Sequence, residues 1–60
     1  MRNFVELHTD GKPFLINIYW IKRVLEDIAN SCTCIYTYNS GLIIVDESYD
    51  SVRKIIYGED

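Results

Sequence analysis

Residues 39–56 read NSGLIIVDESYDSVRKII, and this stretch predicts a turn, a strand and a helix in succession. Gly41 suits the turn, because glycine adopts the positive φ angles that tight turns need. Residues 42–45 are strand formers, and Ser48 belongs to the residue types that cap helix N-termini. After Ser48 the apolar residues fall on one stripe at helical spacing: Tyr49, Val52, Ile55 and Ile56. This pattern predicts a fold, but it includes no catalytic motif.

The chain before residue 39 adds further β-structure. Residues 3–8 alternate well enough for a strand, and Asp10-Gly11 predicts a tight turn into a second strand over residues 13–18. Residues 31–38 form a third β pattern, and its residues on one face are Cys32, Cys34, Tyr36 and Tyr38. Gly58 is expected to end the C-terminal helix.

Residues 17–30 are compatible with two structures. Periodicity favours a helix capped by Asn17, with an apolar stripe made of Ile18, Ile21, Leu25 and Ile28. The alternative is a short turn that Trp20 closes, followed by an extended segment over residues 22–27 with poorer alternation.

Length and composition bound the class of protein. Sixty residues make a single domain, 1–60, and 48% hydrophobic with 25% charged residues predicts a folded chain. A net charge of −3 argues against a partner that is a long nucleic acid. No apolar run approaches the ~20 residues of a membrane span, so we expect no membrane insertion and a cytoplasmic location.

Catalytic and metal-binding patterns are weak. His8 is the only histidine, and no nucleophile stands at a motif spacing from it, so an exposed histidine at a strand end is the simpler interpretation. Asp46 and Glu47 are explained by the positive end of the helix that follows them. Cys32 and Cys34 are expected to be reduced thiols rather than a disulfide or metal site. We therefore expect no enzyme activity, cofactor or metal.

Aromatic and basic residues are the candidate binding groups. Tyrosine and tryptophan combine an apolar ring with a polar tip, and lysine or arginine can meet an anionic ligand. The candidate ligand- or partner-binding residues are Tyr19, Trp20, Lys22, Arg23, Tyr36, Tyr38 and Arg53. Residues 42–45 are apolar on both faces of their strand, so one helix cannot cover them. Either the strands curl into a small barrel, or the sheet packs against another copy or a partner.

Several motifs together resemble the flagellar FlbD family of short bacterial and phage proteins. They are Phe-x-Glu-Leu, Asp-Gly-Lys, Leu15-Ile16-Asn17 with an Ile four residues on, Ile-x-Thr-x-Asn-Ser-Gly and Val-x-Glu-Ser-Tyr-Asp-Ser-Val, and they span nearly the whole chain. The resemblance implies a single helical turn followed by a strand at residues 22–27, which we adopt.

The sequence thus predicts an α+β fold, a small antiparallel sheet or partly closed barrel of four to five strands with one C-terminal helix. The expected function is that of a non-enzymatic, homo-oligomeric binding module. It would be regulatory or inhibitory, of phage or bacterial origin, and would act on a host protein or sequester a small ligand. The alternative that the resemblance implies is an accessory factor of flagellar motility. A minor enzyme or metal protein built on His8 and the cysteine pair is a third hypothesis.

Overall fold

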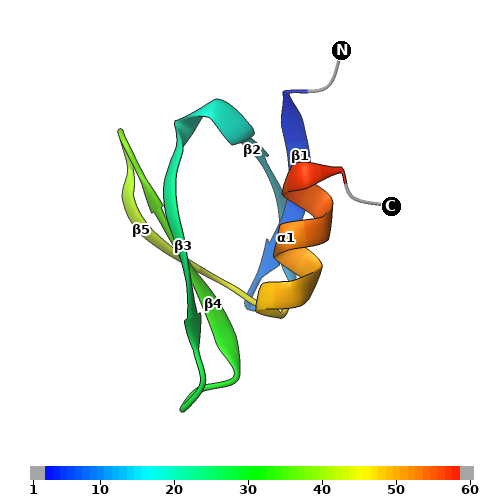
Figure 1. The fold of residues 1–60 in the computed structure, drawn as a ribbon, viewed down its shortest axis with the longest axis vertical. Helices are drawn as coiled ribbons and strands as arrows, with labels where there is room; N and C mark the ends of the chain where they lie inside the picture. The colour runs from blue at the N-terminus through cyan, green and yellow to red at the C-terminus, as the bar shows by residue number, and fades with distance from the viewer. Residues whose placement is uncertain (1–2, 59–60) are drawn as a thin grey trace.

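The computed structural model describes residues 3–58, which form two small antiparallel sheets and one C-terminal helix. The elements in chain order are β1 (Phe4–Thr9), β2 (Lys12–Asn17), the 3₁₀ helix η1 (Ile18–Trp20), β3 (Ile21–Asp27), β4 (Cys32–Thr37), β5 (Gly41–Val45) and α1 (Tyr49–Tyr57). β1 pairs with β2, and the second sheet has the order β3-β4-β5. The hairpin and α1 lie together on one side of the three-stranded sheet (Figure 1).

The α+β prediction is confirmed, and the strands do not form a closed barrel. The five strands form two separate sheets that do not close on each other. The two sheets approach where β5 ends, and there the Asp46 N–H donates to the His8 carbonyl at 2.7 Å. Because that bond lies beyond the last residue of β5, it joins the sheets without extending either ladder into a closed barrel.

Both predicted hairpins are present. Asp10 and Gly11 both have positive φ, at 53° and 76°, which is the geometry of a two-residue turn that matches strand twist. The antiparallel pairing of β1 with β2 extends from Thr9–Lys12 next to this turn to Phe4–Asn17 at the open end of the hairpin. The predicted helix caps are confirmed too, because Ser48 accepts from the Ser51 N–H at 3.1 Å and Gly58 is left-handed at φ 61°.

Residues 17–30 are not a long helix but a single 3₁₀ turn followed by β3, as the adopted interpretation predicted. Asn17 caps only this turn, through a 3.0 Å bond from the Tyr19 N–H to its side-chain oxygen. A register shift between Ile21 and Arg23 makes Lys22 a bulge residue. Because of this extra residue, Ile21 and Val24 both pack against the core although they are three apart. A spacing of three between core-facing residues is typical of a helix, and the bulge makes it compatible with a strand here.

The core lies between the three-stranded sheet, the hairpin and α1. Its fully or nearly fully buried hydrophobic residues are Leu7, Ile16, Ile35, Val45 and Val52. α1 contributes Val52, with Tyr49 and Ile56 half-buried beside it, whereas Ile55 of the predicted stripe is exposed. No helix within residues 3–58 is long and apolar enough to cross a membrane.

Thr33 is a buried polar residue of β4, and its hydroxyl donates to the Glu47 carbonyl at 2.7 Å. Replacing Thr33 by valine is expected to destabilise the protein by about 1–3 kcal/mol, because the carbonyl loses its buried partner. Thr33→Ser keeps the hydroxyl and is the matched control. Urea unfolding of wild type and the two variants measures the difference, and a Thr33→Val protein as stable as wild type would show that this hydrogen bond does not contribute to stability.

Candidate functional site

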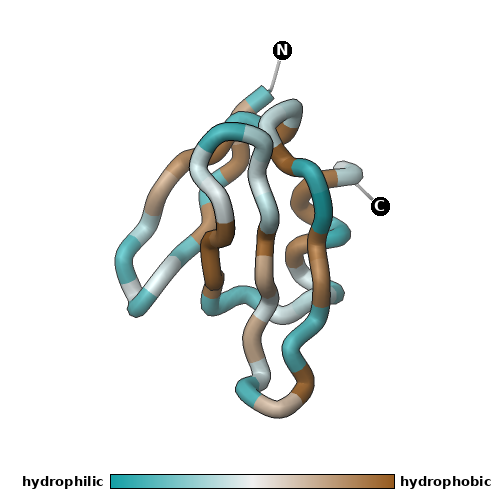
Figure 2. The backbone as a smooth tube through the Cα atoms, turned by 90° about the vertical axis from the view of Figure 1, so that its left-hand side faces the viewer, coloured by the Kyte–Doolittle hydropathy of each residue, from teal (hydrophilic) through white to brown (hydrophobic). Residues whose placement is uncertain are grey.

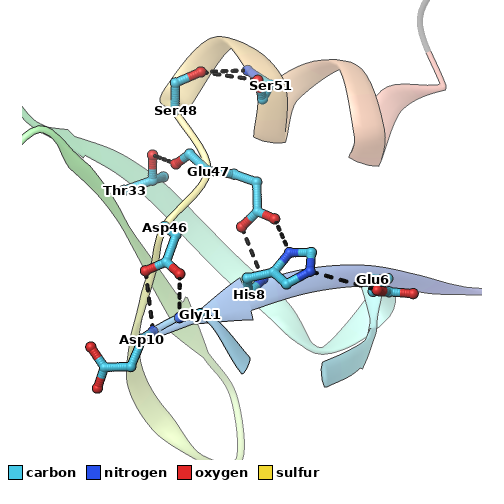
Figure 3. A network of polar contacts seen from close by, with 9 residues as sticks. All are labelled: Glu6, His8, Asp10, Gly11, Thr33, Asp46, Glu47, Ser48 and Ser51. Atoms are coloured by element: carbon cyan, nitrogen blue, oxygen red, sulfur yellow. Dashed lines mark hydrogen bonds and ion pairs between the residues drawn. The ribbon is translucent and has the colours of Figure 1, made fainter. Parts of the chain in front are cut away.

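The loop between β5 and α1 carries two carboxylates, Asp46 and Glu47, and both bind the β1–β2 hairpin (Figure 3). The Glu47 carboxylate accepts from the His8 N–H at 2.9 Å and lies 2.6 Å from the His8 Nδ1. The Asp46 carboxylate accepts from the backbone N–H groups of Asp10 at 3.2 Å and Gly11 at 2.8 Å. This loop therefore connects the hairpin turn, β4 and the start of α1.

These contacts correct the interpretation of Asp46 and Glu47 as residues that serve the helix start. Their side chains point to the β1–β2 hairpin instead, and Asp50 is the acidic residue in the first turn of α1. His8 lies next to the last residue of β1 and its side chain is 41% exposed, as expected of a histidine at a strand end, but its ring is also bonded to Glu47.

His8 faces a carboxylate on each ring nitrogen. Nδ1 contacts Glu47, and Nε2 lies 3.7 Å from the Glu6 carboxylate. The hydrogen bond with Glu47 raises the pKa of His8, and the negative charges of Glu47, Glu6 and Asp46 add to this. A catalytic histidine needs a nucleophile or substrate atom on one nitrogen, so this geometry suits a structural ion pair.

The pKa of Glu47 shifts in the opposite direction to that of His8. Burial on its own raises the pKa of Glu47, but the hydrogen bonds from the His8 ring and backbone outweigh it and lower the pKa below the ordinary 4.5. The pair is thus most strongly charged, and most stabilising, when His8 is protonated and Glu47 is ionised.

The pH dependence of stability follows from these two directions. Because the His8 pKa is raised, its contribution is fully present below the unfolded value of 6.5 and is lost as pH rises through the folded pKa. Because the Glu47 pKa is lowered, its contribution is present above 4.5 and is lost as pH falls through the folded pKa. The stability difference between wild type and His8→Ala is expected to be largest between pH 4.5 and 6.5. Urea unfolding across pH 3–9 measures it, and a flat difference would contradict the ion pair.

The side of the three-stranded sheet away from α1 is a second feature, which we call the outer face. Side chains alternate along the strands, so the neighbours of the buried Ile35 and Val45 point away from the core. Register places Cys34 between Leu25 and Ile44, and Tyr36 beside Leu42. The apolar residues of the outer face are Leu25, Cys34, Tyr36, Leu42 and Ile44.

The outer face is exposed. Its four large hydrophobic side chains are between 38% and 50% exposed. Figure 2 shows the three-stranded sheet in front, with hydrophobic stretches in neighbouring strands. These exposed side chains are neighbours across the three strands rather than scattered singly over the surface.

Both ends of the outer face carry charge on β3. Arg23 pairs with Tyr36 at one end, and Asp27 pairs with Cys32 at the other. Hydrogen bonds from Asn30 lower the pKa of Asp27, and the Cys32 thiol donates to its carboxylate at 3.9 Å. Burial raises the pKa of Cys32, which keeps this thiol protonated.

The structure divides the candidate binding residues into three groups. Four of them lie at the end of β3 and β4 next to η1, where Arg23 pairs with Tyr36 and the Lys22 ammonium stands 6.0 Å from the Tyr38 ring centroid: Lys22, Arg23, Tyr36 and Tyr38. Tyr19 and Trp20 are exposed in η1. Arg53 lies on α1, across a groove from Lys22 and Arg23. Leu25, Leu42 and Ile44 were missed as site residues, although the two-sided apolar pattern of residues 42–45 was their signal.

The groove runs between β3 and α1 and has a volume of about 280 Å³. Its lining residues are Ile18, Ile21, Lys22, Arg23, Val24, Tyr49, Val52, Arg53, Ile56 and Tyr57. Within residues 3–58 no group of three or more histidine, cysteine or acidic side chains could hold a metal ion. The groove is a concave site in which apolar and basic residues meet.

Comparison of the chain with protein-family models, with curated proteins and with solved structures found no match.

Proposed function

We propose that the protein is a small, non-enzymatic binding module that works as a homo-oligomer. In the oligomer, the outer face of one copy is covered by a second copy. The observation that carries this proposal is the group of exposed apolar side chains on that face, which are Leu25, Tyr36, Leu42 and Ile44. A chain of 60 residues has a small core, and self-association is a common way for such chains to gain stability.

Charge supports a pairing between identical faces. A two-fold symmetric interface brings each residue of one copy against the symmetry-related position of the other. Arg23 and Asp27 stand on the outer face on either side of Leu25. A two-fold axis near Leu25 that runs perpendicular to β3 would bring Arg23 of each copy toward Asp27 of the other and would place opposite charges at the rim.

The role of such an oligomer would be regulatory or inhibitory, through occupation of a host protein or sequestration of a small ligand. The contacts of His8 with two carboxylates support a non-enzymatic role, because neither ring nitrogen is directed at a nucleophile. A cytoplasmic location fits the two free thiols, Cys32 and Cys34, since reducing compartments keep thiols unpaired.

Alkylation of Cys34 tests the proposed covering of the outer face. In a Cys32→Ser background Cys34 is the only thiol, and it lies in the middle row of the face. Its alkylation rate by iodoacetamide is expected to fall as protein concentration rises from low to high micromolar, because association buries it. An alkylation rate that is independent of protein concentration would contradict the proposal.

A second candidate is an accessory factor of flagellar motility that acts through protein contacts. The observation that favours it is the single turn η1 followed by β3, the arrangement that the FlbD-like motifs imply. Gene neighbourhood separates the candidates. Motility genes beside this gene would favour the accessory factor, and phage structural or defence genes would favour the inhibitory module.

A further inference from the structure

The β3–α1 groove has an apolar floor and a basic rim. The floor comes from β3 and α1, where Ile21, Val24 and Ile56 are half-buried beside the fully buried Val52. The rim is formed by Lys22, Arg23 and Arg53, and the two aromatic residues of the lining are Tyr49 and Tyr57. In such a site, the apolar side chains can contact the apolar part of a ligand and the basic side chains can bind its charged part.

Charge in the groove opposes the charge of the chain. The chain has nine acidic and six basic side chains, for a net charge of −3. Three of the six basic residues line the groove, and none of its ten lining residues is acidic. In an acidic protein this separation makes the groove a local site of positive potential, which attracts anions.

Two basic groups of the rim, Lys22 and Arg53, remain available to a ligand. Arg53 contacts Asp50 at 3.7 Å, but both side chains are more than half exposed, and exposed ion pairs contribute little. The Lys22 ammonium is 6.0 Å from the Tyr38 ring centroid, a weak contact at an exposed site. Neither group is held in a buried ion pair that a ligand would have to break.

We propose that this groove binds a small amphipathic anion, with its apolar body on Ile21, Val24 and Ile56 and its carboxylate, sulfonate or phosphate at the Lys22 and Arg53 side chains. The proposal rests on the proposed binding role, for which it names the ligand class. The volume of about 280 Å³ is just below the roughly 300–1,000 Å³ of typical ligand pockets and therefore suits a small molecule. The bulge at Lys22 interrupts the regular edge of β3, so a small ligand fits better than an added peptide strand.

A titration with decanoate, a ten-carbon carboxylate, tests the proposal on the full chain. The neutral alcohol decanol and the cation decyltrimethylammonium are probes of similar apolar length and different charge. Amide chemical shifts are expected to move saturably in β3 and α1 with decanoate, with affinity at least about tenfold higher than for decanol. Equal affinity for all three probes, or shifts confined to the outer face, would overturn the proposal.

Two charge-matched variants sharpen the test. Arg53→Gln removes a rim cation, whereas Lys54→Gln removes the neighbouring cation of α1, which does not line the groove. Decanoate binding is expected to weaken by about tenfold in Arg53→Gln and to stay unchanged in Lys54→Gln. An equal loss in both variants would show general attraction by surface charge and would overturn the groove assignment.

The oligomeric state of the same samples separates this proposal from the proposed function. Ile44 lies on the outer face and does not line the groove. Ile44→Asp is therefore expected to retain wild-type affinity for decanoate while its self-association is lost. Loss of decanoate binding in this variant, with the fold intact by amide spectra, would show that the ligand sits on the outer face.

Discussion

Replacing Ile44 by aspartate is expected to convert the oligomer into a monomer at concentrations at which wild type is associated. Ile44 is 50% exposed and stands beside Cys34 in the central row of the outer face. In the proposed interface its replacement would bury a carboxylate without a partner, which costs several kcal/mol. The dissociation constant should therefore rise by at least about 100-fold, as measured by sedimentation velocity across a concentration series.

Leu15→Asp is the matched control for this prediction. Leu15 is an apolar strand residue that is 66% exposed, but it lies on β2 opposite Glu6, in the other sheet. The substitution introduces the same charge at a similarly exposed site, and we expect no change in the dissociation constant. Equal dissociation in the two variants would indicate a general effect of charge, and the outer face would lose its assignment.

Replacing Glu47 by alanine is expected to lower the free energy of unfolding by about 1–3 kcal/mol, because the part-buried His8 N–H loses its acceptor. The Glu47 side chain is only 17% exposed, so water replaces it poorly. A core of this size rarely supplies more than about 3–5 kcal/mol, so the loss is a large fraction of the total. Urea unfolding followed by the fluorescence of Trp20 measures it.

Asp50→Ala is the control for the loop prediction. Asp50 is also acidic and lies four residues from Asp46, but its side chain is 76% exposed and its ion pair is with the exposed Arg53, at 3.7 Å. Its removal should leave the unfolding curve nearly unchanged, because exposed ion pairs contribute little. A loss as large as that of Glu47→Ala would mean that acidic charge near the helix start, rather than the contact with His8, stabilises the protein.

Locally encoded features could be predicted from the sequence. Asp10-Gly11 specifies a turn through backbone conformation alone, and Ser48 and Gly58 specify helix ends through their own side chain or lack of one. These signals depend only on neighbouring residues. The structure confirms each of them.

Features that depend on distant residues could not be predicted. The contact of His8 with Glu47 joins residues 39 apart, and nothing near either residue indicates the partner. The bulge at Lys22 lets Ile21 and Val24, which are three residues apart, both face the core from β3. In a sequence, a spacing of three between apolar residues is typical of a helix. The separation into two sheets depends on how the β1–β2 hairpin meets the end of β5, a property of the folded chain.

The candidate site was predictable in part. Residue types alone suggested Lys22, Arg23 and Arg53 as anion-binding groups, and the structure places all three around one groove. The position of Leu25 on the outer face follows from the bulge and from its pairing with Cys34. Neither can be seen in the local sequence, where Leu25 fits a helical stripe instead. Which sheet face stays exposed depends on where α1 packs, and this is a tertiary property.

The proposed association through the outer face is tested most directly by size-exclusion chromatography with light scattering on the wild-type protein. At high micromolar concentration we expect a mass that is a multiple of the 7.0 kDa chain. We expect this mass to fall toward that of one chain on dilution. A monomer of 7.0 kDa at every concentration would contradict the account.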